Sequence, residues 1–185
     1  MPSRRSNARH KEQCWAKKNS WRKEQEKEML LTKRIDHQEQ QDKEERTHEV
    51  QPGDSFPLGA TVRSDGINFC LYAPDAIAVE LLLFDPPESP EAQAILQLDP
   101  DKNRTSHYWH VFVPGLCAGQ AYAYRVDGPY DPDNGLRFNR HKVLLDPYAR
   151  VVAGWENYSR AAATHPFDNC AEALRAIAVD VQTYD

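Results

Sequence analysis

The sequence predicts an all-β fold, an antiparallel β-sandwich that follows a charged N-terminal extension. Short runs of alternating apolar and polar residues extend through region 60–127, separated by turn signals about every 8–12 residues. No segment of helical length and period interrupts these runs, which argues against an α/β sheet. Charge also divides the chain. Residues 1–50 hold 13 Lys and Arg against 10 Asp and Glu, whereas residues 51–185 hold 10 against 18. A single fold spanning both parts is therefore not expected.

Residues 1–51 form the expected extension, which we interpret as a solvated helix or a disordered tail. Residues 15–49 contain no Gly or Pro and are rich in Glu, Gln, Lys and Arg, which are good helix formers. Few apolar side chains are present to offset the entropy lost on ordering. The alternative is a helix that binds a partner through Trp21, Met29 and Leu30.

The folded module is expected over residues 52–185, with its core at about 55–150. Pro52 and Gly53 end the helix-forming composition, because proline cannot continue a helix and glycine favours turns. Residues 64–66 are expected to form a hairpin turn. The predicted strands are, in order, 60–63, 67–73, 78–84, 94–98, 108–113 and 121–127, and in each of them alternate side chains face the core. Residues 169–179 have helical composition for a few residues.

Composition restricts the partners and the compartment. The acidic balance of residues 51–185 argues against nucleic acid, which requires a basic face. No run approaches the ~20 apolar residues that span a bilayer, and no apolar signal segment follows Met1, so we expect a cytoplasmic protein with no membrane partner. The four cysteines, Cys14, Cys70, Cys117 and Cys170, form no Cys-x-x-Cys pair and are expected to be free thiols.

Several ordered motifs carry a resemblance to a known family. They are PLGAT at 57–61, NF at 68–69, APDA at 73–76, VEL at 79–81, YRVDGPY at 124–130, RFN at 137–139 and LLDPYA at 144–149. In order and spacing they resemble the N-terminal domain of isoamylase-type glycogen-debranching enzymes, which belong to the alpha-amylase superfamily. One departure is Arg140, where the family usually has proline.

The resemblance covers about residues 52–185 and implies both a fold and a context. The implied fold is an immunoglobulin-like sandwich of the glycogen-binding-module kind. In the family this domain precedes a (β/α)8 barrel that hydrolyses α-1,6 branch linkages. Residues 151–185 are accordingly expected to be a C-terminal tail that leads toward a barrel absent from this chain.

Catalytic and metal-binding residues are not predicted. Retaining glycoside hydrolysis needs two carboxyl groups about 5–5.5 Å apart. The resemblance implies that these groups lie at the ends of the strands of the catalytic barrel. The acids of this chain instead cluster in turns, where Asp caps its own backbone. Two stretches that begin like calcium loops, at 99–110 and 131–142, lack the required Gly and Glu positions. We therefore expect no activity from this chain alone, no cofactor and no metal.

Aromatic residues are the candidates for sugar contact, because Trp and Tyr present an apolar face with a polar tip. The carbohydrate-binding candidates are Tyr130, Tyr124 and Trp109, although the alternation that aligns Trp109 with the strand's valines also fits a core position. The loop around Gly128 gives a second set of candidate residues, for which a role in contacts between domains is the alternative to direct sugar contact. Its members are Asp127, Tyr130, Arg137, Phe138 and Lys142, in which Arg137 and Lys142 either donate to sugar hydroxyls or pair with Asp127 and Asp146.

Three functional hypotheses remain open from the sequence. The first is a non-catalytic module of a glycogen- or starch-debranching glycoside hydrolase, with weak α-glucan binding. The second is a stand-alone α-glucan-binding or interaction protein that self-associates or recruits a protein partner through the exposed loop or the extension. The third is a fragment of a full-length debranching enzyme.

Overall fold

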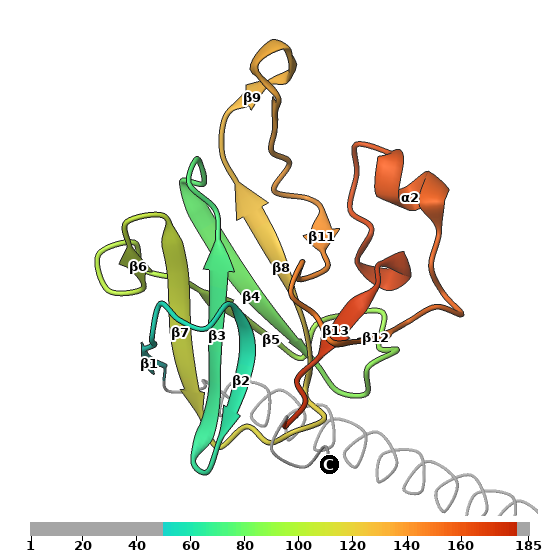
Figure 1. The fold of residues 1–185 in the computed structure, drawn as a ribbon. Coiled ribbons are helices and arrows are strands. Elements are labelled where there is room, and N and C mark those ends of the chain that lie inside the picture. Colours follow the sequence, from blue (N-terminus) through green and yellow to red (C-terminus); the bar gives the residue numbers. More distant parts are fainter. Residues whose placement is uncertain (1–49, 181–185) are drawn as a thin grey trace, which may run out of the picture. The chain divides into compact units, whose positions relative to one another are not determined.

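Two antiparallel sheets form the folded part of the protein (Figure 1). The structure is a computed structural model and describes residues 50–180; the expectations for residues 1–49 concern a part of the chain outside that range. The first sheet has the order β1-β7-β3-β2, with β6 beside β7. Its strands are β1 (Gln51–Pro52), β2 (Gly59–Arg63), β3 (Gly66–Tyr72), β6 (Arg104–Thr105) and β7 (Tyr108–Pro114).

The second sheet has the order β12-β13-β8-β4-β5, with β11 beside β8. Its strands are β4 (Ala78–Phe84), β5 (Ala94–Gln97), β8 (Ala121–Asp127), β11 (Val143–Leu144), β12 (Val151–Ala153) and β13 (Arg175–Ile177). A small hairpin, β9 (Tyr130–Asp131) with β10 (Leu136–Arg137), extends beyond the end of β8. The antiparallel sandwich predicted from the sequence is confirmed, and all six predicted strands are present with small shifts at their ends.

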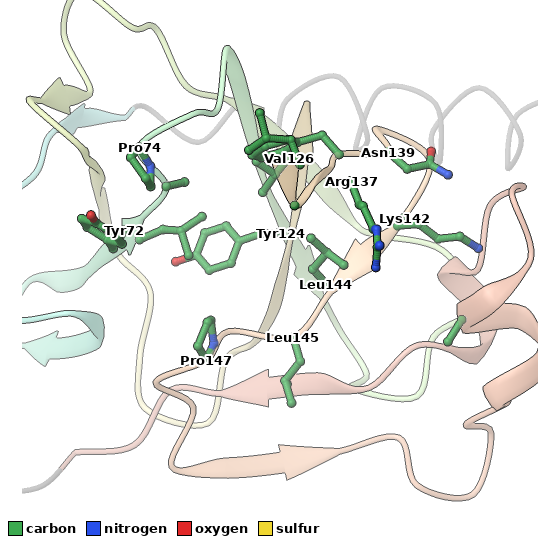
Figure 2. Close-up of a pocket in the computed structure, with 16 residues that line it drawn as sticks. Tyr72, Pro74, Tyr124, Val126, Arg137, Asn139, Lys142, Leu144, Leu145 and Pro147 are labelled. Atoms are coloured by element: carbon green, nitrogen blue, oxygen red, sulfur yellow. The ribbon is translucent and has the colours of Figure 1, made fainter. Parts of the chain in front are cut away.

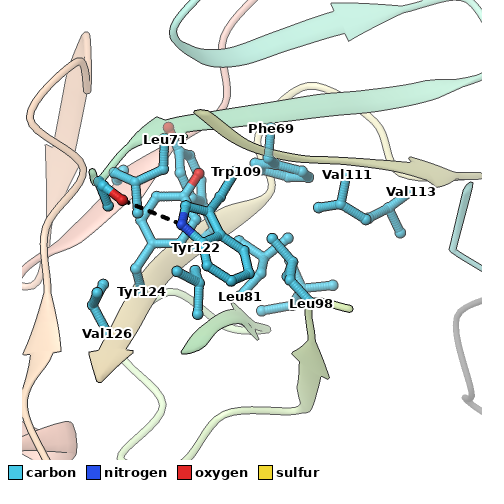
Figure 3. Packing of buried hydrophobic residues seen from close by; sticks show 14 of the residues in the cluster. Phe69, Leu71, Leu81, Leu98, Trp109, Val111, Val113, Tyr122, Tyr124 and Val126 are labelled. Atoms are coloured by element: carbon cyan, nitrogen blue, oxygen red, sulfur yellow. Dashed lines mark hydrogen bonds between the residues drawn. The ribbon is translucent and has the colours of Figure 1, made fainter. Parts of the chain in front are cut away.

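The core lies between the two sheets and follows the predicted alternation. The inward-facing side chains of the first sheet include Phe69, Leu71 and Trp109, and those of the second sheet include Leu81 and Tyr122 (Figure 3). The cross-strand register places Phe69 opposite Val111 and Leu71 opposite Trp109, so each row is continuous across its sheet. Burial of these side chains removes apolar surface from water at roughly 25 cal/mol per Å², which is the main stabilising contribution.

The C-terminal segment differs from its prediction. The short α-helix is α2 (Arg160–Thr164), which Ser159 caps by accepting a hydrogen bond from the Ala162 amide. The expected helix at 169–179 is wrong: a single 3-10 turn, η2 (Cys170–Glu172), leads into strand β13, which pairs with β8 on one side and β12 on the other. Sheet pairing outweighs the helix propensity of the alanines here. The second sheet thus extends past residue 150, where the sequence placed the end of the core.

Each sheet also has a covered outer face. On the first sheet, Asn68 is buried because the Asp54 amide donates to its Oδ1 at 2.7 Å and its Nδ2 donates to the Asp54 carbonyl at 3.0 Å. Gly53 lies so close to the Val111 backbone that an added Cβ would be 2.6 Å from a carbonyl carbon. On the second sheet, Leu82 and Phe84 form a smaller cluster with residues that include Ala173. Within the described residues, no helix is both long and apolar enough to cross a membrane.

Candidate functional site

A groove of about 570 Å³ lies between the end of β3, the β9–β10 hairpin and the 138–147 segment (Figure 2). Its lining is mainly apolar, with Arg137, Asn139 and Lys142 as the long polar side chains. The apolar lining comes from Leu71, Tyr72, Ala73, Pro74, Tyr124, Val126, Leu136, Phe138, Leu144, Leu145, Pro147 and Ala163. The groove brings together Tyr124, Arg137, Phe138 and Lys142 from the two predicted sets of site residues. It leaves out Trp109, Asp127 and Tyr130.

The β9–β10 hairpin carries the most exposed of the predicted residues. Tyr130 is 73% exposed and pairs with Arg137 across the hairpin. The turn between them is a 3-10 helix, η1 (Pro132–Asn134), which ends at Gly135 with a φ of 82°. Since that left-handed conformation favours glycine, the hairpin is locally specified by the sequence. Tyr130 is therefore exposed to solvent on the first strand of the hairpin.

Phe138 packs directly on Gly128 at the base of the hairpin. A Cβ atom added to Gly128 would lie 2.7 Å from Cγ of the Phe138 ring, so no larger residue fits while the ring stays in place. The carboxylate of Asp127 accepts a hydrogen bond from the Gly128 amide at 3.0 Å. Asp127 therefore fixes the backbone beside the groove and does not line the groove itself.

Lys142 has a different role from the one predicted. Its side chain is buried, and Nζ donates to the carbonyls of Ala162 and Phe167, each at 2.6 Å. No ion pair among the described residues joins it to Asp127 or Asp146. Both the sugar-contact and the acid-pairing predictions for Lys142 are thus corrected. An ammonium has three donors, and at least two of them hold the 160–168 segment against the 138–147 segment.

Asn139 reinforces the same attachment. Its Nδ2 donates to the Pro166 carbonyl at 3.0 Å, and its Oδ1 accepts from the His141 amide at 3.0 Å. The Lys142 amide donates to the Asn139 carbonyl at 2.9 Å, which closes a turn. Asn commonly forms such turns with its own side chain, and these bonds fix the loop without proline.

Trp109 and Tyr124 do not offer a surface to a sugar in this structure. The Trp109 side chain is fully buried, and its Nε1 donates to the Ala73 carbonyl at 3.3 Å (Figure 3). Tyr124 is also buried, at the inner wall of the groove, and its hydroxyl has no hydrogen-bond partner among the described residues. Both belong to the inward-facing rows of their strands, which corrects their selection as stacking residues.

A buried carboxyl lies beneath the site. Asp146 Oδ2 accepts from the Tyr122 hydroxyl at 2.7 Å, and Oδ1 accepts from the Tyr148 amide at 2.8 Å. Burial raises the pKa of Asp146 above its usual value, and the two hydrogen bonds oppose that rise. Burial, with a smaller contribution from Asp146, also raises the pKa of the Cys70 thiol to about 11. Asp146 therefore contributes a shared hydrogen-bonded anchor for the 144–149 segment.

Replacing Asp146 with Asn is expected to change how stability depends on pH. The folded-state pKa lies above the value of 3.8 for a free Asp side chain, so the unfolded chain loses its proton first as the pH rises. The wild type therefore loses stability above about pH 4 up to the folded-state pKa, whereas Asp146→Asn has no proton to lose. Urea denaturation at pH 4, 5, 6 and 7 should show that the free energy of unfolding of Asp146→Asn increases relative to that of the wild type as the pH rises. A difference that is constant, or that favours the wild type at higher pH, would contradict this assignment.

The comparisons with known proteins agree with this geometry. The family model described as carbohydrate-binding module 48 (isoamylase N-terminal domain) matches residues 57–149, half of the chain. The chain belongs to this family. The matched range begins just before β2 and runs through the groove-lining 138–147 segment, so the family's sequence pattern includes most of the candidate site.

The relatives of this carbohydrate-binding module 48 chain are much longer proteins. It is 50% identical over 106 residues to the glycogen debranching enzyme of Serratia proteamaculans, a match that covers 57% of this chain and 15% of the relative. It is 34% identical over 123 residues to the chloroplastic isoamylase 1 of Arabidopsis thaliana, covering 65% of this chain and 15% of the relative. The chain thus corresponds to the N-terminal module of these proteins and spans about 15% of their length.

Solved structures agree on the fold. A pullulanase named GBS pullulanase SAP, crystallised with maltotetraose, matches with a TM-score of 0.50 and 20% identity, over 70% of this chain and 15% of that chain.

No group of three potential metal ligands occurs among residues 50–180. The sequence motifs located the groove-forming segments, but the buried bonds of Lys142 depend on a partner segment about 20 residues away. No local signal in the sequence marks that pairing.

Proposed function

We propose that this chain is a non-catalytic N-terminal module of a glycogen- or starch-debranching glycoside hydrolase that acts on α-1,6 linkages, and that the module binds α-glucan weakly. The match to carbohydrate-binding module 48 over residues 57–149 carries the proposal. The presentation of Tyr130 on a rigid hairpin supports it, because exposed tyrosine offers an apolar face and a hydroxyl to a pyranose ring. The described cysteines are free, which fits the reducing cytoplasm in which we place the protein.

The environment of the buried carboxyl supports a non-catalytic role. Asp146 is enclosed by bonds to Tyr122 and Tyr148 and fixes the fold, whereas Asp127 holds its own turn. Retaining hydrolysis requires a pair of carboxyl groups that face the same bond. The matched part of the relatives is about 15% of their length, and we assign hydrolysis to the remainder.

The expected affinity is low because a convex sandwich surface buries little of a ligand. We expect a Kd for maltoheptaose on the order of 0.1–1 mM, which corresponds to roughly 4–5.5 kcal/mol. Affinity electrophoresis in native gels containing glycogen should retard the protein, and Tyr130→Ala should reduce the retardation. A reducing-sugar assay with pullulan should show no release above the blank. Release that persists through purification would overturn the non-catalytic part of the proposal.

The groove supports a second role, as a docking face for the catalytic domain of the same debranching enzyme. Its apolar lining and the half-exposed Leu144 on its edge suit apolar protein side chains better than sugar hydroxyls. In this role Arg137 and Phe138 are interdomain residues, with Lys142 and Asp127 fixing the loops that carry them. A chain without that domain would self-associate through this face or bind another protein there.

The docking role predicts binding in trans. The remainder of the Serratia proteamaculans enzyme, expressed separately, should bind the wild-type chain in a pull-down, and Leu144→Asp should abolish this binding while thermal unfolding stays cooperative. Ile77→Asp, at another exposed apolar position, is the matched control. Equal capture of all three proteins would argue against the groove as the docking face.

A further inference from the structure

Three aromatic rings meet at the end of the first sheet, next to the groove, which one of them lines. Tyr72, at the end of β3, lies opposite Tyr108 at the start of β7, and their ring centroids are 5.4 Å apart. The His107 ring lies 6.2 Å from that of Tyr72. Tyr72 is 48% exposed and also lines the groove, and His107 is exposed. We call Tyr72, His107 and Tyr108 the aromatic cluster.

The backbone beneath the aromatic cluster is held by several independent bonds. The Arg104 guanidinium donates to the carbonyls of Pro74 and Ala76, at 3.0 and 3.3 Å, and its Nε donates to the Ser106 carbonyl at 2.9 Å. The Ala73 amide donates to the His107 carbonyl at 3.0 Å. These bonds join the turn after β3 to the turn before β7, so the backbone positions that carry the three rings are held relative to one another.

The position of the cluster on the sheet is also informative. Tyr72 and Tyr108 belong to the outward-facing rows of β3 and β7, opposite to the core rows that contain Leu71 and Trp109. Further along these rows, Asn68 is buried under the segment that contains Gly53 and Asp54. Tyr72 remains half exposed at the far end, so part of its ring is open to solvent.

We propose that the aromatic cluster is a binding surface for α-glucan, separate from Tyr130. This inference rests on the proposed glucan-binding function and locates a contact surface for it. A pyranose chain fits the chemistry because it presents apolar C–H faces to rings and hydroxyls to the phenol and imidazole groups at their edges. The cluster carries no Lys or Arg terminus of its own, which suits an uncharged ligand. The fixed rings reduce the entropy that a weak ligand must overcome.

The test compares the maltoheptaose affinities of the wild type and four variants, Tyr72→Ala, Tyr72→Phe, Tyr130→Ala and Tyr158→Ala, by tryptophan fluorescence and ¹H–¹⁵N shifts. Tyr72→Ala should weaken binding about three- to tenfold, the range expected for loss of one aromatic contact. Tyr72→Phe keeps the ring and should stay within about twofold of the wild type. Tyr158→Ala, which removes an exposed tyrosine from the 154–159 segment, is the matched control and should leave the affinity unchanged. The amides of residues 72, 107 and 108 should shift in the wild type.

The outcomes separate this inference from the proposed function. If the wild type and Tyr72→Ala bind with equal affinity and Tyr130→Ala is weaker, the cluster is not a glucan surface, although glucan binding stands. If the wild type shows no shifts at millimolar sugar, both the function and the cluster are overturned. If Tyr72→Ala leaves sugar affinity unchanged but loses capture of the catalytic domain in trans, the rings contact protein and the inference is again overturned. Thermal unfolding of each variant checks that a loss of binding is not a loss of fold.

Discussion

Trp109→Ala should be among the most destabilising single substitutions in the module, with an expected loss of about 3–5 kcal/mol in the free energy of unfolding. The side chain is fully buried between the sheets, so its removal leaves a large cavity among residues of both. It also removes the hydrogen bond to the Ala73 carbonyl and the ring on which the Arg104 guanidinium lies, 5.0 Å from the ring centroid. Denaturant unfolding followed by far-UV circular dichroism measures the change.

Trp155→Ala is the matched control for this substitution. Trp155 is 63% exposed, and a surface change away from packed features usually alters stability by less than about 0.5 kcal/mol. Trp109→Phe, which keeps most of the ring volume, should fall between the two. Equal stability of the two alanine variants would mean that Trp109 does not occupy the core, and would reopen it as a sugar contact.

Arg175→Ala is expected to cost about 3 kcal/mol or more, for a different reason. The Arg175 side chain is buried and donates to the carbonyls of Ser89 at 3.0 Å and Cys170 at 2.5 Å, as well as to that of Ala173. Its guanidinium lies 4.1 Å from the centroid of the Phe84 ring. Truncation leaves buried carbonyl acceptors without donors, each of which costs about 1–3 kcal/mol.

Arg175→Lys distinguishes the loss of this geometry from the loss of charge. Lysine keeps the positive charge but lacks the planar fork that reaches several carbonyls at once, so a large part of the loss should remain. Arg140→Ala, at an exposed position in the 138–147 segment, should be close to neutral. Denaturant midpoints of the three variants show whether stability depends on the geometry of the guanidinium or on its charge. An unchanged midpoint for Arg175→Ala would show that these carbonyls are satisfied by solvent.

Periodicity was sufficient to predict the central strands but not the second sheet's C-terminal edge. Strands β3, β4, β7 and β8 have seven residues each. In runs of this length the alternation of apolar and polar residues is distinguishable from the flanking turns. Strand β13 has three residues and an alanine-rich approach, and it becomes a strand only because β8 and β12 offer hydrogen-bonding edges. That information is tertiary, so local composition pointed to a helix instead.

The candidate site shows the same division between local and long-range information. The exposure of Tyr130 and the glycine turn beside it follow from a short stretch of sequence. The role of Lys142 does not, because its carbonyl partners belong to the α2 region. The alternation of strand β7 favoured a core position for Trp109, and its burial supports that interpretation over the sugar-contact one. The aromatic cluster depends on the β3–β7 register, which sequence alone does not fix.

We propose that this chain binds α-glucan and has no hydrolytic activity of its own. The decisive measurement for binding is titration of the ¹⁵N-labelled protein with maltoheptaose, followed by ¹H–¹⁵N spectra, with cellohexaose as the matched β-linked control. We predict shifts that saturate with a Kd on the order of 0.1–1 mM, that are confined to the amides around Tyr130 and the aromatic cluster, and that are absent with cellohexaose. A parallel reducing-sugar assay with branched glycogen, which contains α-1,6 linkages, should show no release above the blank. No shifts at millimolar maltoheptaose would contradict glucan binding, and reducing-sugar release from branched glycogen above the blank would contradict the absence of hydrolysis.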